Sequence, residues 1–423
     1  MLKNRAERIY NRSMIDEIVL RNYARLAVLN GVNLQKGQVL VISCDVNDAP
    51  FARLVTDIAY DIGAKEVIVI WRDEHITRTM YLRAHDSVFE EFPDWIPERF
   101  KYYDEREAAY LSIMSDDPDL LSDVNPERLR KLNILSQKAC KEHKELLVSS
   151  RIRWSIIALP SVKWAKKVFP NLDETQAYNK LWTAIAKSSR IDCEDPIEAW
   201  RKHNEAFTNR AKILNEGQFE ALHFKNSIGT DITIKLAENH VWVGCGNADH
   251  KGVYFYPNIP TEEIFTLPHK NGANGKVVSS MPLVYQMNTI EGIEIEFKDG
   301  EVTAYKASKN EELLKDIIET DEGSRRLGEV ALVPYTSPIS DMKILFYKTL
   351  FDENASCHLA LGKGYSACIK GYEKMSKEEI SGCGCNDSLT HVDFMFGTND
   401  LKVTGVKKNG EEIVIFSDGN YTF

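Results

Sequence analysis

The chain has 423 residues, of which 43% are hydrophobic and 27% charged, and its formal net charge is -10. This length exceeds what one hydrophobic core usually organises, so we expect two domains. The acidic balance argues against nucleic acid as a partner, because phosphate binding needs a basic surface. No window approaches the roughly 18 apolar residues of a membrane span, and no apolar segment follows the charged start, so neither a membrane anchor nor a secretory signal is expected.

The first half of the sequence predicts helices alternating with parallel strands. Apolar spacing indicates a helix over 14–30 and a buried strand over 39–43. A helix over 49–62 then ends at Gly63, and a second strand covers 66–71. Strand, helix and strand in direct succession form a βαβ unit, whose strands must be parallel.

Further along, a helix over 126–146 precedes another strand of the same sheet at 153–159. Helices follow at 173–188 and 195–215, and the second is expected to link the domains. The turn after the first strand, residues 44–50, contains no glycine. A pyrophosphate needs close backbone approach at that turn, so a nucleotide-dependent oxidoreductase is disfavoured.

After about residue 218 the pattern changes to alternation with period two, which is typical of strands. Residues 292–297 turn at Asp299-Gly300 into 302–305, and Asn409-Gly410 precedes 412–416. Such dipeptides between alternating runs are strong hairpin signals. A strand at 230–236 and a helix near 309–319 complete this half.

These patterns together predict the fold class and the domain boundary. We expect an α/β N-terminal domain with a parallel βαβ core over residues 1–217. The C-terminal domain, 218–423, is expected to be α+β and largely antiparallel, and to carry the functional site.

Eight cysteines are scattered along the chain. Without an export signal, this usage is typical of the reducing cytoplasm, where we expect the protein to reside. Cys383-Gly-Cys385 is the one close pair and offers half of a soft metal site. No second Cys/His pair at zinc-finger spacing accompanies it, so two buried or loop thiols are the favoured interpretation.

Metal-ligand side chains are concentrated in the C-terminal part. Divalent cations such as zinc, cobalt or manganese take mixed carboxylate and imidazole ligands, and the candidates are Glu263, Glu329, Glu353, His358, His391 and Asp393. They exceed what one four-coordinate ion needs, which points to a pair of ions. His391 and Asp393 would share one face of an extended segment, and Glu329 is expected to project from a strand end. Taken singly, each of these residues also has a structural interpretation, as a capping or solvated carboxylate or a core histidine.

Four segments resemble a known family in both order and spacing. They are NIPTEEIFTLP (258–268), RRLGEVALV (325–333), DENASCHLALG (352–362) and NDSLTHVDFM (386–395). Together they resemble the aminopeptidase T family (M29), which includes aminopeptidase S and PepS, and the resemblance runs the whole length of the chain. The loop between Tyr365 and His391 is slightly longer here than in the family pattern.

The resemblance implies that two divalent ions share a site in the C-terminal domain, where N-terminal residues are removed from peptides. It assigns ligand roles to Glu263, Glu329, His358, His391 and Asp393, with Glu329 as the bridge. Glu353 matches a further carboxylate of the site and Tyr365 a tyrosine of the catalytic centre. Glu262 stays open as an alternative to Glu263, and His269 lies near enough in sequence to be considered.

A mechanism follows in outline: a water activated by two ions attacks, Glu353 or a metal-bound carboxylate moves the proton, and Tyr365 donates to the oxyanion. The resemblance also implies a homodimer that encloses the sites and admits only short peptides with a free N-terminus. A metal-dependent dipeptidase or other amidohydrolase is one alternative, and a non-catalytic peptide-binding protein of the same fold is another. The native metal (zinc, cobalt, manganese or magnesium) and the preferred side chain are not specified by the sequence.

Overall fold

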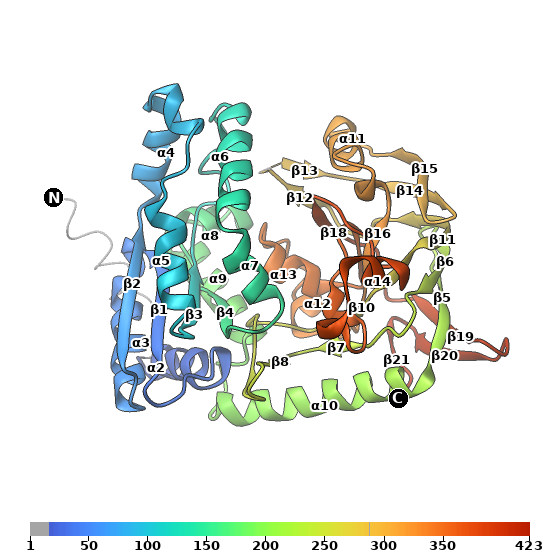
Figure 1. The fold of residues 1–423 in the computed structure, drawn as a ribbon, viewed down its shortest axis with the longest axis horizontal. Coiled ribbons are helices and arrows are strands. Elements are labelled where there is room, and N and C mark those ends of the chain that lie inside the picture. The colour runs from blue at the N-terminus through green and yellow to red at the C-terminus, as the bar shows by residue number, and fades with distance from the viewer. Residues whose placement is uncertain (1–16, 287) are drawn as a thin grey trace. The chain divides into compact units, whose positions relative to one another are not determined.

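The structure is a computed structural model that describes residues 17–286 and 288–423 (Figure 1). The chain forms two compact units. Within the described residues, the first contains 17–201 and Gly246–Pro260, and the second contains Lys202–Cys245 and Thr261–Phe423. Helix α10 (Pro196–Gly217) contributes residues to both units, and the domain boundary after residue 217 stays a prediction.

A parallel sheet with strand order β2-β1-β3-β4 forms the centre of the first unit (Figure 1). Its strands are β1 (Val39–Asp45), β2 (Glu66–Arg72), β3 (Ala109–Met114) and β4 (Trp154–Ala158). Helix α3 (Ala49–Asp61) connects β1 to β2 and packs on both, which confirms the predicted βαβ unit. The chain leaves this helix through Gly63 at φ +93°, a conformation that glycine adopts without a steric penalty.

The helices of the first unit agree with the sequence only in part. They are α2 (Glu17–Leu26), α4 (Glu74–Arg83), α5 (Trp95–Asp104), α6 (Pro126–Ala139), α7 (Lys141–Val148), α8 (Val162–Val168) and α9 (Glu174–Ser188). The prediction of one helix over 126–146 was wrong, because the chain breaks at Cys140 into α6 and α7. The predicted helix over 14–30 is α2 followed by a π-helical turn, Ala27–Gly31, and its first residues lie outside the described part of the chain.

A buried ion pair fixes β4 to the Gly246–Pro260 segment within the first unit. The Arg153 guanidinium contacts the Asp249 carboxylate, and their side chains are only 4% and 5% exposed. Arg153 also donates to the Val32 carbonyl at 3.1 Å. Removing one partner of such a pair leaves the other charge buried without compensation.

Changing Arg153 to alanine is therefore expected to destabilise the protein by about 3–5 kcal/mol. The urea midpoint of unfolding, followed by tryptophan fluorescence, measures this change. Arg130→Ala is the matched control, because Arg130 forms an exposed pair with Glu127 and exposed pairs contribute little. Equal midpoint shifts for the two variants would contradict the assignment.

The second unit is built mainly from antiparallel strands. One sheet has the order β15-β14-β11-β6-β5-β19-β20-β21. In chain order its strands are β5 (Phe219–Lys225), β6 (Asp231–Leu236), β11 (Pro268–Val278), β14 (Glu294–Lys298), β15 (Glu301–Lys306), β19 (Lys402–Lys407), β20 (Glu412–Ser417) and β21 (Asn420–Tyr421). The predicted hairpins β14–β15 and β19–β20 are both present. The fold class predicted from the sequence is thus confirmed.

A smaller antiparallel sheet, β18-β17-β16-β10-β7, lies in the interior of this unit. Its strands are β7 (Val243–Gly244), β10 (Ile264–Thr266), β16 (Leu327–Leu332), β17 (His358–Gly362) and β18 (His391–Met395). Every residue of β16 and β17 is buried. Charged side chains on these strands therefore need hydrogen bonds or opposite charges, since burying a lone charge is costly.

Shorter elements complete the chain. They are β12 (Leu283–Tyr285), β13 (Asn288–Ile290), α11 (Glu311–Ile318), α12 (Pro338–Met342), α13 (Thr349–Asp352) and α14 (Lys377–Gly382) in the second unit, and β8 (Asn247–Ala248) and β9 (Tyr254–Phe255) in the first. Among the described helices, none has the length and apolar character that crossing a membrane requires.

Candidate metal centre

The register of the interior sheet brings the predicted ligands to one face. Glu329 pairs with Ala360, and Ala360 pairs with Asp393 on the next strand. Directly opposed residues in an antiparallel sheet point to the same side, so both carboxylates flank the small Ala360 side chain. Glu329 is the third residue of β16, so the expectation that it projects from a strand end was wrong.

One group of ligands consists of Glu263, Glu329 and His358. Nε2 of His358 lies 3.0 Å from Oε2 of Glu263 and 3.5 Å from Oε1 of Glu329. Glu263 immediately precedes β10, and His358 is the first residue of β17. All three side chains are buried. Of the two neighbouring glutamates, Glu263 is the one whose carboxylate joins this group.

A second group consists of Glu329, His391 and Asp393. Nε2 of His391 lies 3.7 Å from Oε2 of Glu329 and 3.3 Å from Oδ1 of Asp393. The two oxygens of Glu329 thus face different imidazoles. Within each group one ligand atom per residue lies within 4.8 Å of the others.

Backbone carbonyls orient both imidazoles. Nδ1 of His358 donates to the Ser356 carbonyl at 3.1 Å, and Nδ1 of His391 donates to the Lys363 carbonyl at 2.7 Å. With Nδ1 occupied in this way, Nε2 of each ring faces the carboxylates, as ligating histidines require. Sequence reasoning missed these partners because a backbone carbonyl is the same for every residue type.

Protons balance part of the negative charge of these carboxylates. Burial, opposed by a hydrogen bond from His358, raises the pKa of Glu329 to about 7. Burial lowers the pKa of His391, but the charges of Asp393 and Glu329 outweigh it and raise that pKa to about 10. For His358, hydrogen bonds to Glu263 and Glu329 likewise outweigh burial and hold the pKa well above its usual value.

The donor set fits divalent cations. Carboxylate oxygens and imidazole nitrogens are ligands of zinc, cobalt, manganese and related ions. The buried carboxylates of Glu263 and Glu329, with the partly buried Asp393, need positive charge to compensate them. The residues that would hold ions are Glu263, Glu329, His358, His391 and Asp393.

Glu353 and Tyr365 lie beside these ligands. Burial and the charges of Glu263 and Asp393 raise the pKa of Glu353 well above its usual value, yet its carboxylate belongs to neither group of three. Its role as a metal ligand stays a prediction. The Tyr365 ring lies 4.7 Å from the His391 ring, centroid to centroid, and burial together with the Glu329 charge raises the pKa of its hydroxyl well above the usual range.

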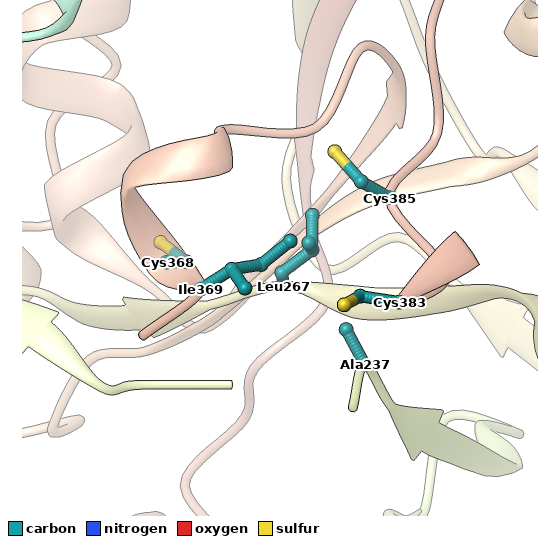
Figure 2. Packing of buried hydrophobic residues seen from close by; sticks show 6 residues of the cluster. All are labelled: Ala237, Leu267, Cys368, Ile369, Cys383 and Cys385. Atoms are coloured by element: carbon teal, nitrogen blue, oxygen red, sulfur yellow. The ribbon is translucent and has the colours of Figure 1, made fainter. Parts of the chain in front are cut away.

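The cysteine pair belongs to a hydrophobic cluster rather than to a ligand group. Figure 2 shows Cys368, Cys383 and Cys385 packed with Leu267 and Ile369, their sulfur atoms pointing in different directions. All three are buried free thiols, as predicted for the pair. Within the described residues, neither ligand group contains a cysteine or His269. Tyr365 packs against this cluster, which therefore supports the loop beside the site.

Comparisons with known proteins show the family of this chain. A family model described as thermophilic metalloprotease (M29) matches residues 16–421. Aminopeptidase 2 of Geobacillus stearothermophilus is 44% identical over 96% of this chain and 98% of its own length. Aminopeptidase AmpS of Bacillus subtilis is 43% identical with the same coverage. Wild-type AmpT of Thermus thermophilus has a similar structure, with a TM-score of 0.90 at 36% identity over 96% of this chain and 99% of that one.

The fold and the ligand groups therefore define a metal-dependent hydrolase. The chain belongs to the M29 family of metalloproteases, and as an enzyme it is an aminopeptidase. This confirms the resemblance drawn from the four sequence segments.

Proposed function

We propose that this aminopeptidase holds two divalent ions and releases N-terminal amino acids from short peptides. The placement of Glu329 carries the proposal: Oε1 lies 3.5 Å from His358 Nε2 and Oε2 lies 3.7 Å from His391 Nε2. Glu329 thus presents its two oxygens to two ligand sets, as would suit a carboxylate that helps to hold two ions. Zinc, cobalt, manganese and magnesium all accept these donors.

The side chains around the ligands are suited to proton transfer and charge stabilisation. A pair of divalent ions supplies Lewis acidity, which lowers the pKa of a water molecule and polarises the peptide carbonyl. Glu353 lies beside the charges of Glu263 and Asp393, so its carboxylate can take a proton from the attacking water and return it to the leaving amine. The Tyr365 ring packs on His391, and its hydroxyl, a proton donor at neutral pH, would donate to the developing oxyanion.

Changing Tyr365 to phenylalanine is expected to lower kcat by about 10²–10³-fold, the usual effect of losing one oxyanion donor. KM and metal content should stay the same, because the ring can still pack on His391 and Phe265. Steady-state kinetics with an amino-acid p-nitroanilide measures the change. Tyr372→Phe is the matched control, since Tyr372 packs on the same cluster. A kcat within about threefold of the unmodified enzyme would remove Tyr365 from the reaction.

Assembly and location are further parts of the proposal. We propose a homodimer whose two chains limit access to the sites, so that only short peptides enter. The eight cysteines are all free thiols, which supports a reducing cytoplasmic location. Analytical ultracentrifugation at several protein concentrations tests the dimer, and a monomer at all of them would contradict it.

The decisive experiment combines metal analysis with three substrates. We expect about two ions per chain, rapid cleavage of an amino-acid p-nitroanilide, and no cleavage of its N-acetylated form. Cleavage of the acetylated form would indicate a general amidohydrolase. Activity restricted to dipeptides would indicate a dipeptidase, and neither ions nor turnover would indicate a binding protein.

A further inference from the structure

The peptide group between Thr261 and Glu262 is held on both sides by buried side chains. Its carbonyl oxygen, on Thr261, accepts a hydrogen bond from Nε2 of His203 at 2.8 Å. Its N–H, on Glu262, donates to Oδ1 of Asn354 at 2.6 Å. His203 is 9% exposed and Asn354 is fully buried, so water competes little for either bond. We call His203 and Asn354 the peptide clamp.

Both clamp residues are anchored within the second unit. The His203 ring, on α10, packs against Phe207 with 4.4 Å between ring centroids. Nδ2 of Asn354 donates to the Leu350 carbonyl at 3.0 Å, and the Asn354 carbonyl accepts from the Ser337 hydroxyl at 3.3 Å. The clamp therefore joins the Thr261–Glu262 peptide to a helix and to the turn after α13.

The same asparagine contacts a second carboxylate of the site. Its Nδ2 lies 3.4 Å from Oε1 of Glu353. One amide group thus links the backbone beside Glu263 to the carboxylate assigned to proton transfer. Neither residue was singled out from the sequence, because a lone histidine and a lone asparagine carry no spacing signal.

Glu263 needs such support because the sheet does not fix it. It precedes β10, which begins at Ile264, so no paired strand residue sets its position. A peptide group is planar, and holding both its polar ends restricts rotation of the backbone that leads into Glu263. The Glu263 carboxylate then reaches His358 Nε2 at 3.0 Å.

We propose that the peptide clamp orients the Glu263 carboxylate toward the other two members of its ligand group, Glu329 and His358. His203 and Asn354 are then positioning residues for metal binding. This inference rests on the proposed two-ion site. Mutating a residue that orients a metal ligand typically lowers metal affinity by about 10–100-fold. The clamp acts on one ligand of one group, so the effect should be confined to one of the two ions.

The test measures metal affinity of the apoprotein by chelator competition. Asn354→Ala and His203→Phe are each expected to weaken one ion by about 10–100-fold and the other by less than about threefold. Asn226→Ala is the matched control, because that amide also holds two backbone groups, the Thr230 N–H and the Phe396 carbonyl. It should cost stability without changing metal affinity.

A second arm separates this inference from the function on which it rests. Glu263→Gln should itself weaken one ion, and Asn354→Ala in that background should weaken it no further, because the clamp acts through Glu263. Unchanged ion binding in Glu263→Gln would overturn the site and the clamp together. The clamp alone would be overturned by a different result: Glu263→Gln weakens one ion as expected, but Asn354→Ala and His203→Phe both bind ions like the unmodified protein.

Discussion

Changing Glu329 to glutamine is expected to lower kcat/KM by more than about 10³-fold, because the interactions that the two proposed ions would make with the reacting groups are worth several kcal/mol. The amide keeps the shape of the side chain but loses its charge and one of its two oxygen acceptors. Both ligand groups share this residue, so metal content should fall to at most about one ion per chain. Inductively coupled plasma mass spectrometry on dialysed protein gives the metal content, and kinetics with a p-nitroanilide gives the rate.

Glu412→Gln is the control for this experiment. Glu412 is an exposed residue at the start of β20, in the same unit of the chain, and removing its charge should change neither rate nor metal content. Circular dichroism should show the same fold for both variants. A Glu329→Gln enzyme that keeps two ions and most of its rate would exclude a bridging carboxylate.

Metal-free protein is expected to lose stability as pH rises from about 5 to about 9, whereas metal-loaded protein should not. The Glu329 pKa is raised from 4.5 to about 7 in the folded protein. Its contribution to folding stability is therefore fully present below pH 4.5 and is lost as the pH rises through 7. The His391 pKa is raised from 6.5 to about 10, so its contribution is complete below pH 6.5 and is lost toward pH 10. Both effects have the same sign.

Ions replace these protons, so metal affinity should rise with pH over the same interval. For each proton that an ion displaces, metal affinity rises about tenfold per pH unit. A free metal concentration of about a hundred times Kd stabilises the folded protein by about 2.7 kcal/mol. Thermal melts at pH 5, 6, 7 and 8, with and without chelator, measure the difference in Tm. Glu329→Gln should show a shallower dependence in the metal-free state. A constant difference at every pH would contradict the assigned protonation states.

The sequence predicted those parts of the fold whose local signals agree with their tertiary environment. The βαβ unit was recognisable because β1 is buried and α3 ends at a glycine that adopts positive φ. Helices α4 and α5 were missed, since neither has a buried residue and so neither shows apolar periodicity. Strand β3 was missed as well, although its buried positions, Ala109, Leu111 and Ile113, alternate with partly exposed ones.

The candidate site was predictable as a list of residues and not as an arrangement. Ligand-type side chains could be selected, and His391 and Asp393 were placed on one face by their spacing. Their meeting with Glu329 depends on the pairing Glu329–Ala360–Asp393 across three strands. Register between distant segments is a tertiary property, which no local pattern contains. The peptide clamp is harder still to foresee, because its targets are backbone groups.

The site restricts which residue can stand at position 360, in the middle of β17. Valine or isoleucine would suit the middle of a buried strand better than alanine, by β-propensity alone. At position 360 either would extend its branches between Glu329 and Asp393, which pair with it on the two neighbouring strands. If Glu329 and Asp393 hold ions as proposed, a small side chain at position 360 would leave space for them between the two carboxylates, at the expense of some β-propensity in the strand.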